Sequence, residues 1–316
     1  MHEQVLLLRE ADKSAILDVF EVYLESGMKN DSELTTARLL ITCPDRPGIV
    51  SAVSSFLYNH GANITALDQY ATASEQGTYF MRLEFQTPHL DVSRQVLPAT
   101  FAEAVARRYE MDWTLSFASD RKKIAILVSK HDHALLELLW RWSRQNLPCA
   151  MHSVISNHPD LGSEVERFGV PFHHIPFTAE QRLESEARME SLLAGADLIV
   201  LARFMQILSP EMVARWPHRI INIHHSFLPA FVGANPYQQA YDKGVKLIGA
   251  TAHYVTADLD QGPIIEQGVH RVSHQHNVES LRALGQEMER QVLARAVRWH
   301  LEDRVLVHAN KTIVFD

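Results

Sequence analysis

The chain lacks the features of secreted, membrane-spanning and disulfide-stabilised proteins. It has only two cysteines in 316 residues, Cys43 and Cys149, and each lies in an apolar run, where a free thiol packs as a small hydrophobic group. No stretch approaches the roughly 20 consecutive apolar residues that a membrane helix needs, and the N-terminus is too acidic for a secretory signal. The sequence therefore predicts a soluble, cytoplasmic protein without a disulfide and without a membrane partner.

Blocks of positive charge are absent as well. The formal net charge is -8, and the lysines and arginines are scattered, whereas neutralising a phosphate backbone needs clustered cations. Nucleic acid is therefore not expected as a partner. Histidine is plentiful, with 18 residues, but none of them stands in the HExxH spacing of a zinc-binding helix. Surface or hydrogen-bonded structural roles are favoured for most of these histidines.

The pattern of the remaining sequence is that of two α/β domains behind an N-terminal segment. Residues 1–36 hold an amphipathic stretch and a polar linker, to which the sequence assigns no role. From residue 37 the apolar pattern changes to period two, and residues 37–119 follow the order βαββαβ, the ferredoxin-like arrangement. The expected strands are 38–43, 63–71, 78–86 and 111–118, and the expected helices are 49–61 and 92–108.

The second domain, residues 120–316, alternates apolar strands with longer amphipathic helices. This alternation predicts a Rossmann-like, mostly parallel and twisted sheet that is covered on both faces. Sites in such sheets lie at the carboxyl ends of the strands, near a switch in strand order. The expected strands are 124–130, 150–157, 172–177, 197–204, 219–224 and 248–255, the expected helices are 135–145, 163–169, 179–195 and 278–300, and a short strand-like segment is expected at 307–316.

Polar residues gather after two of these strands. Alternation in the strand 219–224 puts Asn222 and His224 on one face, so that an amide and an imidazole point together. Such a pair can simply bond to the backbone of a nearby loop. The carboxylate-rich loop 256–262, which follows the strand 248–255, favours a reaction site instead.

The first strand-to-helix turn carries a resemblance to a known family of domains. The segments CPDRPGIV and GANI are similar to those of ACT domains, small regulatory domains whose equivalent loop commonly binds an amino acid. The resemblance implies an effector site, and a sharp helix start or a dimerising role is the alternative reading of the same turn. The implied effector-binding residues are Asp45, Arg46, Pro47, Gly48, Ile49, Asn63 and Ile64.

Residues 219–267 resemble the formyltransferase family that uses 10-formyltetrahydrofolate. That family has an Asn-x-His at a strand end, SLLP-like residues just after it, and an aspartate in a later loop. The matching positions are Asn222, His224, Ser226–Pro229 and Asp260, in the family's order. The resemblance implies that Asn222 and His224 stabilise the oxyanion of the attacked formyl group, while Asp260 positions or activates the attacking group.

Within this family the chain is most similar to the deformylase branch, and this likeness extends from about Arg38 to the C-terminus. The resemblance implies hydrolysis of 10-formyltetrahydrofolate to tetrahydrofolate and formate, which would serve one-carbon metabolism and purine biosynthesis, with no metal and no cofactor. It also implies an apolar slot for the folate; the alternative reading makes Phe204 and Met205 ordinary core residues. The implied folate-binding residues are Phe204, Met205, Ile207, Leu208, Val255, Thr256 and Asp258.

Three alternative functions stay open at this point. A formyltransferase acting on a phosphorylated amine is disfavoured, because the turn Ser129–His133 has no glycine and contains an acidic residue, which suits phosphate poorly. A metallohydrolase would use His224, His225, His253 and Asp260. A sensor would combine an amino-acid receiver with a folate-binding domain that has lost its activity.

The expected partners are a folate substrate, an amino-acid effector and a second copy of the chain. Methionine and glycine are the hypothetical effectors, and ACT-like domains often pair their sheets, which favours a homo-oligomer of unspecified size.

Overall fold

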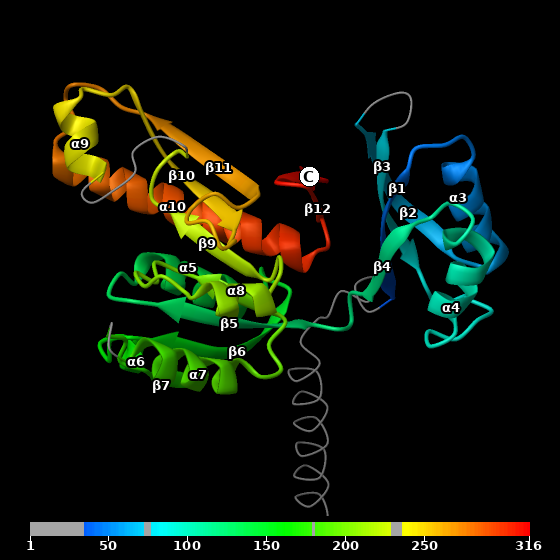
Figure 1. The fold of residues 1–316 in the computed structure, drawn as a ribbon, viewed down its shortest axis with the longest axis horizontal. Helices are drawn as coiled ribbons and strands as arrows, with labels where there is room; N and C mark the ends of the chain where they lie inside the picture. The colour runs from blue at the N-terminus through cyan, green and yellow to red at the C-terminus, as the bar shows by residue number, and fades with distance from the viewer. Residues whose placement is uncertain (1–34, 73–76, 179–180, 229–235) are drawn as a thin grey trace, which may run out of the picture. The chain divides into compact units, whose positions relative to one another are not determined.

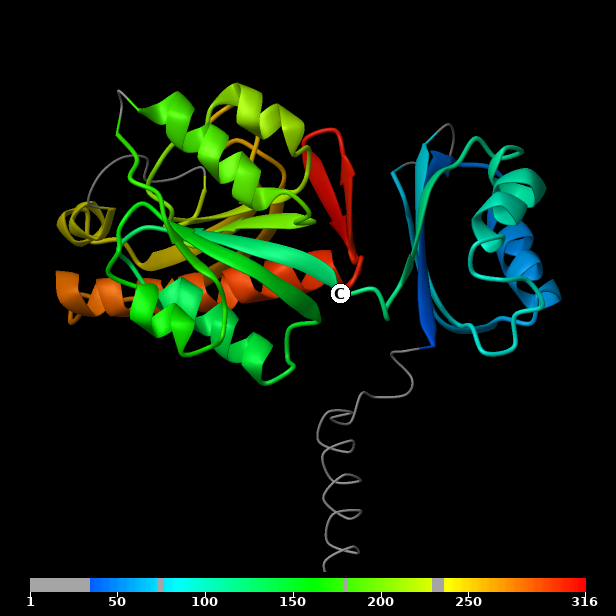
Figure 2. The same ribbon diagram turned by 90° about the horizontal axis from the view of Figure 1, so that it is seen from below.

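The computed structural model describes residues 35–72, 77–178, 181–228 and 236–316. The described residues form two compact units, which are divided between Asp120 and Arg121 (Figures 1 and 2). Most of the expected N-terminal segment 1–36 lies outside the described residues. No described helix combines the length and the apolar character that crossing a membrane requires. Cys43 and Cys149 are both free and buried.

The first unit has the predicted ferredoxin-like arrangement. Its four strands form one antiparallel sheet in the order β2-β3-β1-β4, and both helices lie on one face of that sheet (Figure 2). Alternate residues of the first strand, among them Leu39 and Ile41, point into the core between sheet and helices. The elements are β1 (Thr36–Pro44), α3 (Ile49–Asn59), β2 (Asn63–Ala71), β3 (Thr78–Gln86), α4 (Leu97–Phe101) and β4 (Asp112–Phe117).

The expected helix 92–108 is wrong at its start and in its type. The α-helix α4 begins at Leu97, and a π-helical turn, Ala102–Ala106, continues it. Pro98 stands in the first turn of α4, the position where a missing N–H and a fixed φ are tolerated. The turn is π-helical because the Arg107 N–H bonds to the carbonyl of Ala102, 3.1 Å away and five residues back.

The second unit is a seven-stranded sheet in the order β11-β10-β9-β8-β5-β6-β7. The five strands from β9 to β7 are parallel, as predicted, whereas β10 runs antiparallel to both of its neighbours, β9 and β11. The elements are β5 (Lys122–Val128), α5 (His133–Ser143), β6 (Cys149–Ser156), α6 (Gly162–Glu166), β7 (Phe172–His174), α7 (Arg182–Leu193), β8 (Leu198–Leu201), α8 (Pro210–Arg215), β9 (Ile220–His224), α9 (Pro236–Asp242), β10 (Leu247–Tyr254), β11 (Ile264–Arg271), α10 (Val278–Leu301), β12 (Val305–His308) and β13 (Lys311–Val314).

Helices cover this sheet on both faces, and alternate residues of the central strand β5 feed two separate cores. Ile124 and Ile126 pack with side chains of α5 and α10, whereas Ala125 and Leu127 pack with side chains of α7 and α8. Figure 2 shows the two pairs of helices on opposite sides of the strands. The strand order reverses between β5 and β8, so the carboxyl ends of these strands mark the place where a ligand site is expected.

Candidate active site

Two neighbouring strands bring an amide and two imidazoles together. In the antiparallel pair of β9 and β10, Asn222 stands opposite His253, and His224 stands opposite Thr251. Side chains at opposite positions of such a pair lie on the same face. Asn222 Nδ2 is 3.2 Å from His253 Nε2, and His253 Nδ1 is 2.9 Å from the carbonyl of Tyr254. Because Nδ1 donates to that carbonyl, Nε2 of the neutral ring accepts from the amide.

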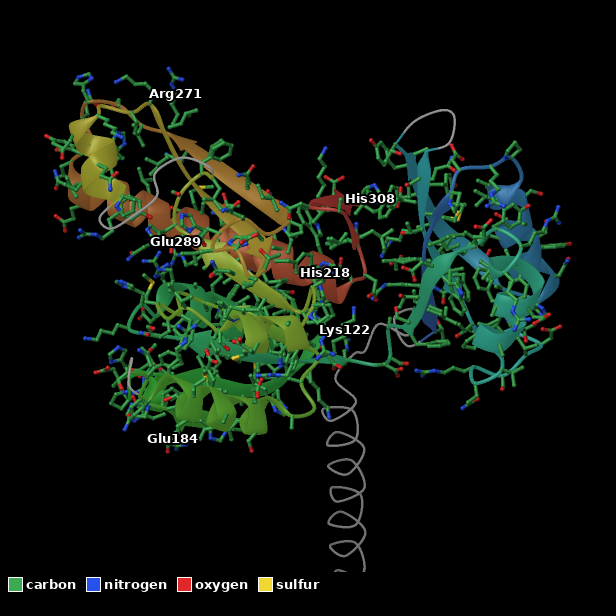
Figure 3. The ribbon with its side chains drawn as sticks, in the orientation of Figure 1. Lys122, Glu184, His218, Arg271, Glu289 and His308 are labelled. Atoms are coloured by element: carbon green, nitrogen blue, oxygen red, sulfur yellow. The ribbon has the colours of Figure 1, made fainter. Side chains whose placement is uncertain are left out.

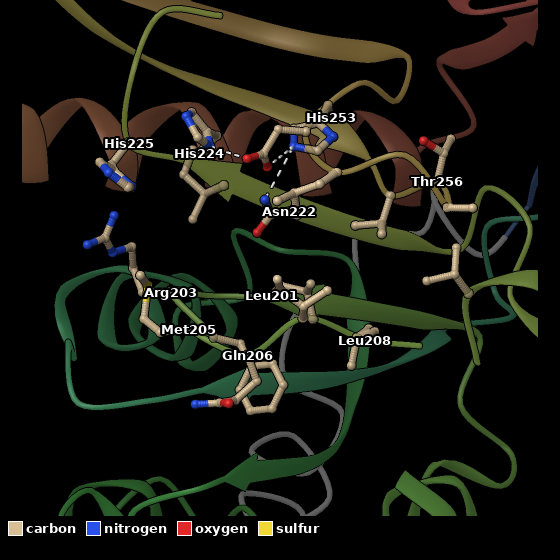
Figure 4. Close-up of a pocket in the computed structure, with 18 residues that line it drawn as sticks. Leu201, Arg203, Met205, Gln206, Leu208, Asn222, His224, His225, His253 and Thr256 are labelled. Carbon is tan, nitrogen blue, oxygen red and sulfur yellow. Dashed lines mark hydrogen bonds and ion pairs between the residues drawn. The ribbon is translucent and has the colours of Figure 1, made fainter. Parts of the chain in front are cut away.

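The carboxylate of Asp260 completes the cluster from the loop that follows β10. One of its oxygens is 3.2 Å from His224 Nδ1, and the other is 3.6 Å from His253 Nε2 (Figure 4). Asp260 has a left-handed backbone, with a φ of 55°, in a loop that the bond from Tyr254 N–H to the carbonyl of Pro263 closes at 2.9 Å. The predicted convergence of Asn222, His224 and Asp260 from two distant stretches is therefore present in the structure.

Electrostatics keep this carboxylate ionised. The neighbouring imidazole of His224, and then that of His253, lower the pKa of Asp260 well below its usual range and outweigh the opposing effect of burial. His224 is 8% exposed, and its Nε2 is buried without a hydrogen-bond partner among the described residues. An imidazole held through Nδ1 thus has its second nitrogen available for a ligand.

A cavity of about 340 Å³ opens beside these groups. Six of the seven predicted folate-binding residues line it; the seventh, Asp258, is exposed and does not, although its neighbours Ala257 and Leu259 do. Phe204 lines the cavity and also belongs to a core cluster, whereas Met205 and Ile207 are 55% and 59% exposed. The lining residues of the cavity are Leu201, Arg203, Phe204, Met205, Gln206, Ile207, Leu208, Val213, Asn222, Ile223, His224, His225, His253, Val255, Thr256, Ala257, Leu259 and Asp260.

The sequence did not indicate His253 as a partner of Asn222, and it did not indicate Arg203 at all. The sequence indicates His253 only as a ligand of the alternative metal site, together with His224, His225 and Asp260. Within the described ranges, no group of three or more His, Cys, Asp and Glu side chains is placed to hold a metal ion. Alternation in β10 puts His253 on the same face as Thr251, but its pairing with Asn222 depends on the register of β9 and β10.

The predicted effector residues form the turn before α3 and the start of β2. Gly48 has a φ of 94°, and a Cβ there would lie 3.0 Å from the Tyr109 hydroxyl, so glycine makes the sharp helix start possible. Arg46 forms an exposed ion pair with Glu110. Ile49 is buried in the core, Asn63 is exposed and Ile64 is partly buried. The turn is thus structurally required, whatever it binds.

Comparison with known proteins defines the class of each unit. A family described as formyl transferase matches residues 122–297, and the ACT domain family matches residues 37–92. The fold and the site thus define a formyl transferase-type unit that follows an ACT domain.

The most similar relatives narrow this class. The chain is 54% identical to the formyltetrahydrofolate deformylase of Bacillus subtilis (strain 168), over 90% of this chain and 96% of that protein. It is also 54% identical to the formyltetrahydrofolate deformylase of Mycobacterium bovis, over 88% of this chain and 90% of the other. The crystal structure of a formyltetrahydrofolate deformylase from Pseudomonas syringae pv. tomato superposes with a TM-score of 0.87 at 43% identity, covering 95% of this chain and all of that one. The chain belongs to the formyltetrahydrofolate deformylase family.

Proposed function

We propose that the chain hydrolyses 10-formyltetrahydrofolate to tetrahydrofolate and formate. The observation that carries this proposal is the convergence of an amide, an imidazole and an ionised carboxylate at one end of a cavity with apolar walls. This arrangement supplies hydrogen-bond donors where negative charge develops during acyl transfer, and a charge that holds the donors in place.

In the proposed reaction, the folate lies against Phe204, Met205, Ile207 and Leu208 on one side and Val255 and Thr256 on the other. The oxygen of a water molecule forms a bond to the formyl carbon, and the carbonyl oxygen takes the negative charge. Asn222 Nδ2, which has a second N–H besides the one given to His253, and His224 Nε2 donate to that oxygen. The bond between carbon and N10 then breaks while one proton of the added water passes to N10 through solvent, and the formic acid that is formed loses its acidic proton to solvent.

We assign Asp260 the role of orienting His224 and the attacking water, and not that of a general base. A carboxylate whose pKa is held so low is a weak base, so it gains little by taking a proton from water. It accepts from His224 Nδ1, which fixes the ring and stabilises positive charge on it while Nε2 supports the oxyanion. The same carboxylate can accept a hydrogen bond from the attacking water.

Water is favoured over a phosphorylated amine as the acceptor. In the turn Ser129–His133, Ser129 Oγ donates to Asn157 at 2.7 Å and accepts from the Met205 N–H, and His133 Nε2 is 2.8 Å from Glu289. These polar groups are already occupied, and the turn has no glycine that would let backbone N–H groups approach a phosphate.

The activity is tested by supplying purified full-length protein with 10-formyltetrahydrofolate and no amine. We expect formate and tetrahydrofolate in equal amounts, at a rate that exhaustive chelation leaves undiminished. Formyl transfer only in the presence of an amine would instead identify a transferase. Binding of the folate with no turnover would identify a sensor.

We also propose that the first unit binds an amino acid at the turn Asp45–Ile49, together with Asn63 and Ile64, and that its sheet pairs with that of a second copy. The match to the ACT family supports both proposals. Titration with methionine and with glycine should change the turnover rate, and Asn63→Ala should weaken the response. The effector proposal is abandoned if neither amino acid binds or alters turnover.

A further inference from the structure

A buried arginine lies at one end of the cavity with most of its donors unused. Arg203 follows β8 in a left-handed backbone conformation, with a φ of 64°. Its side chain is 11% exposed. Its Nε and Nη1 are both buried and have no hydrogen-bond partner in the part of the chain that the structure describes. A buried charged group whose N–H donors have no acceptor is unfavourable unless a ligand supplies that acceptor.

The nearest carboxylate does not satisfy this guanidinium. Glu289, on α10 (Figure 3), is 1% exposed, and its closer oxygen is 3.5 Å from Arg203 Nε, which is too far for a hydrogen bond. The lone pairs of Glu289 are directed elsewhere. Tyr237 donates its hydroxyl proton to one oxygen at 2.9 Å, and His133 Nε2 is 2.8 Å from the other. Glu289 therefore balances the charge of Arg203 without occupying its N–H groups.

The arginine shares the cavity with the reacting groups. Arg203, His224 and His225 all line it, and Figure 4 shows the guanidinium reaching toward His225, on the opposite side from Leu208 and Thr256. The ring of His225 stacks on that of His224, with centroids 5.1 Å apart. The unused nitrogens of Arg203 and the unpartnered Nε2 of His224 thus belong to the same cavity.

We propose that Arg203, with His225 beside it, forms a carboxylate subsite that receives the formate ion released at His224. This inference rests on the proposed function. Hydrolysis converts a neutral formyl group into an anion directly beside the ionised Asp260, which repels it. A guanidinium is suited to a carboxylate because its planar N–H groups match the two oxygens and because it stays charged at every relevant pH. The subsite draws the anion away from Asp260 and clears the reaction centre for the next water.

The test is binding of sodium formate to the full-length protein by calorimetry, at constant ionic strength and against sodium chloride. Wild type should bind formate, and Arg203→Gln should weaken that binding by about tenfold or more, with Arg203→Lys in between. Product inhibition by formate should weaken in parallel. Arg298→Gln, which removes a 55% exposed arginine from α10, is the matched control and should bind formate as wild type does.

Two further comparisons keep the subsite and the activity separable. If Arg203→Gln alone fails to fold because Glu289 is left buried and unbalanced, the double variant Arg203→Gln/Glu289→Gln, which removes both charges, replaces it. Formate release by an enzyme whose formate affinity does not depend on Arg203, or a wild type that does not bind formate, overturns the subsite. Formate binding through Arg203 in a protein that releases no formate upholds the subsite and overturns the proposed function.

Discussion

At the scale of single residues, His253 bonds through both of its ring nitrogens, and the two bonds together orient the Asn222 amide. The carbonyl of Tyr254 takes the proton of Nδ1, which leaves Nε2 as an acceptor that only the NH₂ end of the amide can satisfy. Without this bond the amide could turn its oxygen toward the developing oxyanion, where two negative partial charges would meet. His253 is therefore a positioning residue.

Replacing His253 with leucine, which has a similar volume, should lower kcat by about ten- to a hundredfold while KM changes little. The reason is that the donor on Asn222 is misdirected, whereas the apolar slot is left in place. Steady-state kinetics measure the two constants separately. His60→Leu, in the first unit, is the control, and an effect of His253→Leu confined to KM would contradict the positioning role.

At the scale of elements, the loop between β10 and β11 depends on one close backbone approach. A Cβ on Gly262 would lie 1.8 Å from the carbonyl oxygen of Tyr254, so only glycine lets the loop close against the strand. The Asn310 side chain donates to the Gln261 carbonyl at 3.0 Å from the other side. These contacts hold Asp260 within reach of His224.

Gly262→Ala should therefore displace Asp260 and reduce both stability, by about 1–3 kcal/mol, and kcat. Denaturant unfolding and steady-state assays measure the two effects. Gly195→Ala is the matched control, because Gly195 has a φ of +87° but nothing within 4 Å of an added Cβ. The control should lose a little stability through backbone strain and keep its kcat. Equal kcat losses in the two variants would argue against a special role for the loop.

Much of this architecture could be predicted from the local sequence pattern. The structure differs from the prediction where contacts between distant segments determine the conformation. Alternation was sufficient to place Asn222 and His224 on one face, because the period of a strand is local. It could not show that His253 faces Asn222, since that depends on β10 running antiparallel in an otherwise parallel neighbourhood. The expected strand 197–204 ends at Leu201, because Arg203 has a left-handed backbone conformation. An arginine in the sequence does not predict that conformation.

The sequence pattern did not predict the short helices, although one of them is preceded by a typical N-cap residue. Helix α8 begins at Pro210, and the preceding Ser209 accepts a hydrogen bond from the Met212 N–H at 3.2 Å, which is an ordinary N-cap. Its single turn of apolar residues is too short to give a periodic pattern.

At the scale of the whole molecule, two histidines of the second unit couple its stability to pH. Burial lowers the pKa of His225 to about 4 and the pKa of His300 to about 3. A hydrogen bond of 2.7 Å joins His300 Nδ1 to the Tyr254 hydroxyl. Both histidines have folded-state pKa values below the ordinary value of about 6.5. At a pH between the two values, the histidine is therefore protonated in the unfolded chain and neutral in the folded chain.

The contribution of the two histidines to the free energy of unfolding should therefore be complete above about pH 6.5. As the pH is lowered toward 4.5, the free energy of unfolding should fall by up to about 1.4 kcal/mol per pH unit for each histidine. Asp260 acts only at lower pH, because its contribution is lost below the ordinary aspartate pKa of about 4. In His300→Gln, the free energy of unfolding should depend less steeply on pH between 6.5 and 4.5, because one fewer proton is bound on unfolding. Denaturant unfolding at several pH values measures this dependence. An unchanged slope would contradict the assignment to His300.

The proposed mechanism depends most on Asp260 as the charge that holds His224 against the formyl group, and formate release by Asp260→Asn in the amine-free assay tests it directly. The kcat of this variant should fall about a hundredfold or more. Asp258→Asn, the same change two residues away on an exposed side chain, should keep a kcat close to that of wild type. Formate release by Asp260→Asn at the rate of wild type would contradict the mechanism.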